Sequence, residues 1–134
     1  MEAALMRLVW QRAKNRCEYC QMPQAFDAAT FEIDHIISQK HHGPTIAGNL
    51  CLSCYYCNVF KGSDISSLEP KTRKLTPLFN PRRQKWATHF RWQEAYLIGR
   101  TPVGRVTVAL LYINDDHRVE LREGLIDEGV FPPA

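Results

Sequence analysis

Two short cysteine motifs, CEYC at residues 17–20 and CYYC at residues 54–57, decide how this chain folds. The pairs are separated by 33 residues (21–53), a spacing typical of metal sites in which each pair presents two sulfurs to one ion. Zn²⁺ prefers a closed shell of thiolates, and a helix N-terminus after the second pair would stabilise them. We therefore predict a structural Zn²⁺ site, whose ligands are Cys17, Cys20, Cys54 and Cys57.

The fifth cysteine, Cys51, competes for this site. Cys51 and Cys54 are also separated by two residues, so Cys51 has the spacing to replace Cys57. We predict instead that Cys51 is a small apolar side chain packed inward. Buried free thiols are the alternative for all five cysteines, and the paired spacing argues against it. An odd number of cysteines without a secretory leader also argues against a disulfide framework.

Length and charge narrow the class of protein. The 134 residues, 45% of them hydrophobic, predict one domain over residues 1–134 with a modest core. No apolar run is long enough to span a membrane, and the charged N-terminus does not resemble a leader, so we expect a soluble, cytoplasmic protein. Residues 61–105 carry ten basic and three acidic residues, a surplus that favours a polyanionic partner. A solvated basic loop is the alternative.

Hydrophobic periodicity and turn residues predict a mixture of helices and strands. Pro-rich residues 68–84 are predicted to be extended and irregular, and residues 38–48 to be a loop. The predicted helices cover residues 3–15, 55–63, a segment starting after Thr101-Pro102, and about 115–128; the predicted strands cover 31–37 and a hairpin of 89–92 with 96–99.

The predicted strand FEIDHII, residues 31–37, contains two residues that a core strand would not place there, Asp34 and His35. Together with CEYC, GNL at 48–50 and CYYCNVFKG at 54–62, this strand resembles the HNH endonuclease family over residues 7–63. The resemblance implies a zinc-stapled ββα-metal finger. It also implies cleavage of nucleic acid with the help of a divalent metal ion.

The resemblance assigns a role to each matching residue. His35 corresponds to the general base, and an imidazole suits this role because it exchanges protons near neutral pH. Asp34 corresponds to a metal ligand, and Asn58 to the last motif position, often His in the family. An amide oxygen there implies Mg²⁺ or Mn²⁺. Asn49 corresponds to the residue that braces the finger loop and orients the histidine, and Lys61 to a phosphate contact or a solvated lysine.

One geometric condition follows from the placement of Asp34 and His35. Neighbours on a regular strand face opposite sides, so the strand must bend or end at His35 if both serve one site. For a lone histidine, a satisfied core position would be the better interpretation. Asn58 has its own alternative, a cap at the start of a helix.

Residues 64–134 resemble a C-terminal extension of some small HNH proteins, through PLFNPRRQKWATHFRW and TPVGR. We expect it to pack on the core 7–63 and to contain a hairpin and two helices. Its aromatic residues are expected to be mostly core. Its cations supply candidate phosphate contacts, which together with Lys61 are Arg82, Arg83, Lys85 and Arg91.

The sequence thus predicts an α+β fold with an N-terminal helix, a zinc-stapled finger and a C-terminal extension. The predicted function is a metal-dependent HNH endonuclease acting on DNA, with RNA as another conceivable substrate and a second copy or partner protein supplying specificity. A nucleic-acid-binding zinc module without catalysis is the main alternative. A protein–protein adaptor on the same scaffold is a third.

Overall fold

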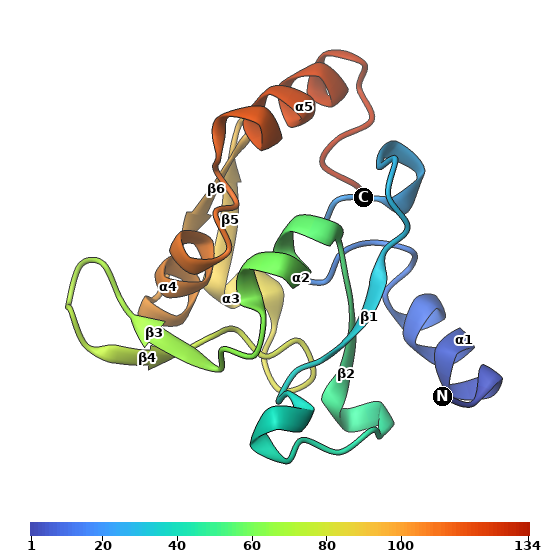
Figure 1. Cartoon of the computed structure of the whole chain (residues 1–134). Helices are drawn as coiled ribbons and strands as arrows, with labels where there is room; N and C mark the ends of the chain where they lie inside the picture. The colour runs from blue at the N-terminus through green and yellow to red at the C-terminus, as the bar shows by residue number, and fades with distance from the viewer.

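The computed structural model describes residues 1–134 and shows an α+β fold of short helices and three two-stranded antiparallel sheets (Figure 1). Its elements in chain order are α1 (Ala3–Arg12), β1 (Glu32–His35), β2 (Leu50–Ser53), α2 (Tyr55–Lys61), β3 (Ser66–Leu68), β4 (Leu75–Pro77), α3 (Trp86–His89), β5 (Phe90–Gln93), β6 (Tyr96–Gly99), α4 (Pro102–Leu110) and α5 (Asp116–Asp127). The predicted α+β class is therefore confirmed.

The first sheet and the helix after it form the ββα unit expected from the motifs. β1 pairs with β2 so that Asp34 lies opposite Cys51 and His35 opposite Leu50. Every residue of β2 is buried, which makes this strand the centre of the unit. Cys54 is the N-cap of α2, and its sulfur accepts a hydrogen bond from the Cys57 amide at 3.4 Å. Gly62, with φ +51°, is the C-cap that follows Lys61.

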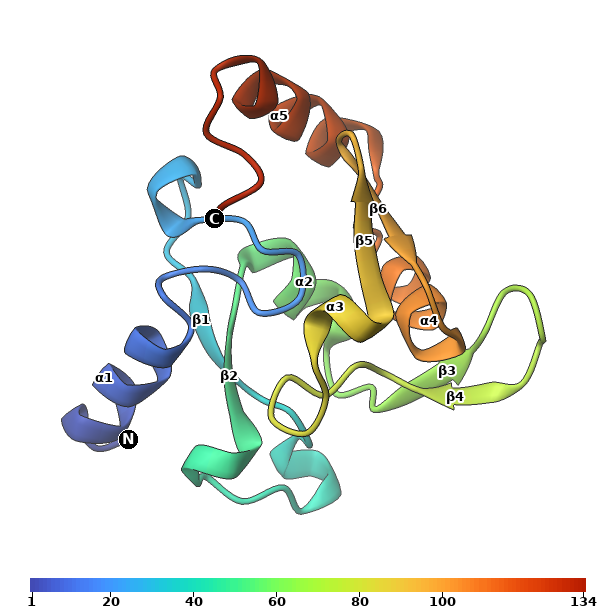
Figure 2. The ribbon, with the colours of Figure 1, turned by 180° about the vertical axis from the view of Figure 1, so that it is seen from behind.

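The C-terminal half holds two hairpins and three helices, of which the short α3 was not predicted, as Figures 1 and 2 show from opposite sides. The predicted hairpin is present as β5 and β6. α4 starts with Thr101 as its N-cap, which accepts from the Gly104 amide at 3.1 Å, and Pro102 occupies the first helical turn. α5 starts after its N-cap Asp115 and stops before Gly129, close to the predicted bounds.

Two predictions about local structure were wrong. The first helix ends at Arg12 and not at residue 15, because Lys14 and Asn15 have left-handed backbones with φ of 55° and 57°. Residues 68–84 are not irregular throughout, because β3 and β4 form a hairpin there. Its strands have three residues each, too few for a visible alternation, and Pro77 is tolerated at the strand end.

The hydrophobic core joins both halves of the chain. One cluster of 20 buried residues includes Val9 of α1, Leu52 of β2, Phe90 of β5 and Leu111 after α4. Phe79 and Phe90 are buried within it, and Trp86 and Trp92 pack against it, in line with the expected core role of the aromatic residues. No helix combines the length and apolar character needed to cross a membrane.

The C-terminus returns to the N-terminal loop, beside which both views place it (Figures 1 and 2). The ring of Phe131 packs against Trp92 with centroids 5.1 Å apart, and Arg16 donates to the carbonyl of Ala134 at 2.7 Å. These contacts tie the last residues to β5 and to the segment that leads into Cys17.

Candidate active site and metal centre

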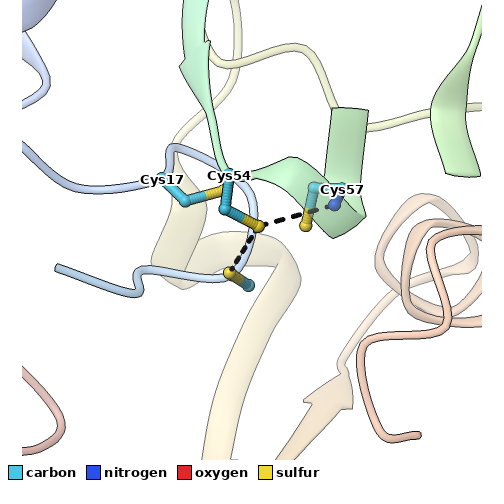
Figure 3. Close-up of side chains that lie close together, drawn as sticks. Cys17, Cys54 and Cys57 are labelled. Carbon is cyan, nitrogen blue, oxygen red and sulfur yellow. Dashed lines mark hydrogen bonds between the residues drawn. The ribbon is translucent and has the colours of Figure 1, made fainter. Parts of the chain in front are cut away.

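Four buried cysteines converge between the loop after α1 and the start of α2 (Figure 3). All four sulfurs lie within 4.8 Å of one another, and Sγ of Cys20 and Cys54 are 3.7 Å apart. A tetrahedral Zn²⁺ with Zn–S bonds of about 2.3 Å requires sulfurs about 3.8 Å apart, so the spacing suits this ion. The cluster is positioned to bind a structural metal ion, and its members are Cys17, Cys20, Cys54 and Cys57.

The first cysteine pair is presented by a tight turn. The amide of Gln21 donates to the Cys17 carbonyl at 2.9 Å, and the amide of Cys17 donates to the Met22 carbonyl at 2.9 Å. Gln21 has φ +65°, which turns the chain back on itself directly after Cys20. Two sulfurs two residues apart therefore point to the same place.

Cys51 lies outside this cluster. Its side chain is fully buried on β2, and its Sγ is 3.6 Å from the hydroxyl of Tyr19. Burial raises the pKa of Cys51 above the ordinary value, so the side chain stays a neutral thiol. The structure thus separates Cys51 from the cluster that contains Cys57.

A buried arginine from the C-terminal helix contacts the cysteine cluster. Arg118 of α5 is 5% exposed and donates to Sγ of Cys57 at 3.1 Å. It also donates to the carbonyls of Leu111 and Tyr112, which fixes the guanidinium. Burial alone would lower the pKa of Arg118, but the cysteine charges, Cys57 foremost, raise it above the ordinary value. A cation at this point offsets the net charge of −2 that four thiolates and one Zn²⁺ would carry.

Burial raises the pKa of Cys57 well above the ordinary value, because a thiolate in this enclosed place lacks water. A bound dication removes this penalty, because metal coordination deprotonates thiols. The donor set and its surroundings therefore fit Zn²⁺. Sequence reasoning predicted α5 but missed Arg118, since only packing decides which side of that helix faces the sulfurs.

Asp34 and His35 lie where β1 stops. The strand ends at His35 and the chain bends at Ile36 and Ile37, so the predicted irregularity at His35 is present. The ring Nε2 of His35 is 2.8 Å from the hydroxyl of Thr45. The carboxylate of Asp34 instead faces Lys61, with Oδ2 3.3 Å from Nζ.

Lys61 lies inward rather than at the surface. Its side chain is 2% exposed, and Nζ donates to the carbonyl of His35 at 3.1 Å while pairing with Asp34. In this structure Lys61 is therefore neither a solvated lysine nor open to a phosphate. Lys61 thus links α2 to the end of β1. It contacts the side chain of Asp34 and the backbone carbonyl of His35.

Asn49 closes the loop that follows His35. Its Oδ1 accepts from the Ile37 amide, and its Nδ2 donates to the carbonyls of Ile37 and Pro44, each at 2.9 Å. The loop passes so close to Gly43 that an added Cβ would lie 1.7 Å from the Ile37 oxygen. The braced segment carries Thr45, which contacts His35. Thr45 was not predicted, because no motif or spacing in the sequence indicates its role.

The oxygens of Asp34 and Asn58 are the donors that the family resemblance assigns to a hard cation. Oδ2 of Asp34 is buried and accepts no hydrogen bond, despite the nearby Lys61. Burial raises the pKa of Asp34, and Lys61 acts in the opposite direction. Asn58 is half-buried on α2 and its side chain forms no hydrogen bond, so the amide oxygen is uncommitted. Carboxylate and amide oxygens fit Mg²⁺ or Mn²⁺.

The remaining predicted phosphate contacts divide into two groups. Arg82 pairs with the carboxylate of Glu18 and is largely buried. Arg83, Lys85 and Arg91 are exposed and form no ion pair. A cavity of about 260 Å³ connects this region to the end of β1, lined among others by Ile36, Ile37, Lys61, Ile65, Pro77 and Arg83.

Comparison with known proteins agrees with this architecture. The sequence profile of the HNH family, described as HNH endonuclease, matches residues 17–64. Septu protein PtuB of Bacillus thuringiensis is 25% identical over 111 residues, which cover 81% of this chain. The chain spans about two fifths of that relative, since the aligned region is 40% of its length.

No solved structure matches the chain. The alignment to the Bacillus protein is longer than residues 17–64 and therefore includes part of the chain outside the profile match. Inside that match lie both cysteine pairs, the Asp34-His35 pair and the two asparagines. Residues 17–64 of this chain therefore form a domain of the HNH endonuclease family.

Proposed function

We propose that this chain is a metal-dependent endonuclease that hydrolyses phosphodiester bonds in DNA, with His35 as its general base. The observation that carries the proposal is the placement of His35 at the end of β1, with one ring nitrogen held by Thr45 and the other unbonded. A histidine held in this way is oriented but not blocked. It is supported by a loop that Asn49 locks in place.

Nε2 of His35 is the ring nitrogen that contacts Thr45, so Nδ1 is the nitrogen proposed to act. When the hydroxyl of Thr45 accepts the Nε2 proton, the lone pair resides on Nδ1. Nδ1 then takes a proton from the water that attacks the phosphorus atom. The bond from Lys61 to the His35 carbonyl keeps the backbone of this residue from shifting as the ring becomes charged.

Asp34 and Asn58 would hold a Mg²⁺ or Mn²⁺ ion. When bound, this ion supplies charge neutralisation at the phosphate and stabilises the leaving oxygen. Lys61 contacts Oδ2 of Asp34 and favours the ionised form of this carboxylate. The other oxygen, Oδ1, is left for coordination. Asn49 acts as a brace and Thr45 as an orienting group, and neither needs to touch the substrate.

Arg83, Lys85 and Arg91 are proposed as phosphate contacts, because they are exposed cations without acidic partners. We assign Arg82 to structure instead, since it pairs with Glu18 of the first cysteine knuckle. DNA is the proposed substrate. RNA is tested alongside it, because phosphate contacts alone do not distinguish the two.

We further propose that the finger, residues 7–63, and the extension, residues 64–134, fold as one unit. The shared hydrophobic cluster and the contact of Arg118 with Cys57 support this. Trp86 adds a hydrogen bond from its indole N–H to the Tyr19 carbonyl at 2.8 Å. An extension bound through the metal cluster itself is part of the domain rather than an appendage.

The test is nicking of supercoiled plasmid by the zinc-loaded chain with Mg²⁺, Mn²⁺ or no added divalent ion. We expect nicking that requires the added ion and falls by about 10²–10⁴-fold in His35→Ala. His41→Ala is the matched control, because His41 is exposed in the same loop, and it should retain activity. Equal activity of the wild type and His35→Ala would contradict the proposal.

A nucleic-acid-binding module without catalysis is the second candidate. One observation favours it, the ion pair of Asp34 with a buried lysine, which partly satisfies the carboxylate without a metal ion. Binding of DNA by the wild type without nicking in either metal would support this candidate. Metal-dependent nicking would exclude it.

A further inference from the structure

The turn between β3 and β4 is a cluster of exposed cations on a projecting hairpin. Figures 1 and 2 show the hairpin extending away from the rest of the chain in both views. Its tip carries Lys71, Arg73 and Lys74, all exposed and without an acidic partner. The only acid of the segment, Glu69, is fully buried and pairs with Arg105 of α4. Three positive charges therefore remain uncompensated at the tip.

The tip is held in one conformation by its own hydrogen bonds. The carboxylate of Glu69 accepts from the amides of Lys71 and Thr72, the latter at 2.8 Å. The Glu69 carbonyl accepts from the Arg73 amide at 2.8 Å, and the Glu69 amide donates to the Lys74 carbonyl at 2.9 Å. A polyanion that binds here would order little backbone, which lowers the entropic cost of association.

The outer face of the hairpin adds an apolar pair. Leu68 and Leu75 are cross-strand partners, 49% and 71% exposed, and Leu75 is the most exposed large apolar residue of the chain. The next pair, Ser67 and Thr76, faces the other side, where Thr76 is buried. Two-stranded ribbons enter nucleic-acid grooves, and apolar side chains such as leucine wedge between base steps there.

The base of the hairpin shares a cavity with the residues that directly follow His35. Ile65 and Pro77 line the 260 Å³ cavity together with Ile36 and Ile37, the residues that follow His35. Arg83, one of the proposed phosphate contacts, lines the same cavity. The cavity thus lies between the residues that follow β1 and the base of the hairpin, whose tip carries the three cations.

We propose that the β3–β4 hairpin is an arm that binds duplex nucleic acid beside the active site, with Lys71, Arg73 and Lys74 on phosphates and Leu68 and Leu75 against the groove. This inference rests on the proposed function. A nucleic acid is favoured over other polyanions because the base of the arm shares a cavity with Ile36 and Ile37, which directly follow His35. Binding by the arm is a separate property from hydrolysis and can be measured without it.

The test measures binding of the zinc-loaded chain to a fluorescent DNA duplex of about 20 base pairs by anisotropy, over a range of salt concentrations. His35→Ala is the background, so that the duplex stays intact. The arm variant is Lys71→Gln/Arg73→Gln/Lys74→Gln. We expect its Kd to rise at least about tenfold, and the slope of log K against log salt to fall by about 2–3, because each phosphate contact contributes about 0.9.

A matched control removes three exposed cations elsewhere, in Arg7→Gln/Lys14→Gln/Arg100→Gln. Each set includes one residue with a left-handed backbone, Arg73 or Lys14, so both carry the same conformational risk. The control should bind within about threefold of the background protein. Equal losses in the two sets would overturn the inference, because they would show an effect of net charge alone.

Leu68→Ser/Leu75→Ser should weaken binding with the salt slope unchanged, since no phosphate contact is lost. Anionic vesicles containing phosphatidylserine serve as a further probe. Loss of vesicle binding in the arm variant, with duplex binding unchanged, would assign the arm to a membrane and overturn the inference. If the arm residues are replaced in the otherwise wild-type chain and plasmid nicking at low substrate concentration is retained, the arm is rejected and the proposed function stands. Duplex binding that depends on the arm, with no nicking by the wild type, would support the arm and reject the proposed function.

Discussion

The cysteine cluster and the His35 face, formed by the end of β1 and the loop that carries Thr45, are two sites built in opposite ways by one small domain. The cluster takes side chains from the N-terminal knuckle and α2, is covered by α5, and is fully buried. The His35 face comes from the end of one strand and the loop after it, and its histidine is half-exposed. A closed four-ligand shell stabilises a fold, whereas chemistry on a polymer requires an open site. The difference separates the part that holds the domain together from the part for which we propose catalysis.

The largest effect should come from breaking the closed site. Cys57→Ala removes one ligand, and the remaining three thiols lose most of their zinc affinity. We expect less than one tightly bound Zn²⁺ per chain and loss of cooperative thermal unfolding, measured by metal analysis and circular dichroism.

Cys51→Ala is the matched control for this change. Cys51 is equally buried but contacts Tyr19 and not the cluster, so zinc content should be unchanged. The stability loss should stay near 1–2 kcal/mol, as for a small buried side chain. Zinc loss in Cys51→Ala would show that the ligand set differs from the one in the structure.

The open site should respond to its brace. Asn49→Ala leaves three backbone groups in the loop after His35 without partners, namely the Ile37 amide and carbonyl and the Pro44 carbonyl. We expect a loss of about 2–4 kcal/mol in the free energy of unfolding, because buried unpaired groups are costly. Urea unfolding measures this loss, and zinc content should be unchanged. A stability equal to that of the wild type would show that the loop does not depend on Asn49.

Arg118→Met tests how the cysteine cluster is supported. It removes the guanidinium next to Cys57 while keeping an apolar stem. We expect zinc affinity to fall by about 10–100-fold, the usual range for groups that support metal ligands. Competition with a chromophoric chelator measures it, and in Co²⁺-substituted protein the thiolate-to-metal absorption bands should shift.

Arg118→Lys keeps the charge and should recover part of the affinity. Unchanged affinity and spectrum in Arg118→Met would limit this arginine to packing between α5 and the finger. Nicking activity at saturating zinc should change little in either variant, since Arg118 contacts the cluster and not the His35 face.

The smallest effect should come from Thr45→Val, which removes the hydroxyl beside His35 and keeps the shape. The residue is exposed, so we expect a stability change below about 1 kcal/mol. The nicking rate should fall by about tenfold, because His35 loses the hydrogen-bond partner that orients its ring. Thr45→Ser retains the hydroxyl and should restore the rate. A full rate in Thr45→Val would remove Thr45 from the mechanism.

Local sequence patterns predicted most of the elements near the site. The end of α2 near Gly62, the start of α4 after Thr101-Pro102 and the β5–β6 hairpin follow from residues within a few positions of each element. The β3–β4 hairpin was missed because it depends on Glu69, whose carboxylate binds the turn and reaches Arg105, 36 residues later. Such a contact leaves no periodic trace in the sequence.

The cysteine spacing by itself determined that two knuckles meet, because one ion must gather four sulfurs whatever else the chain does. The Asp-His pair and the two asparagines predicted the finger through their resemblance to the HNH family. Only the tertiary structure decided the side chains that meet across long separations. Lys61 turns inward to Asp34, Arg82 pairs with Glu18, and Arg118 reaches Cys57. A charge is recognisable in a sequence, but its partner is chosen by which faces pack together and by the cost of burying that charge unpaired.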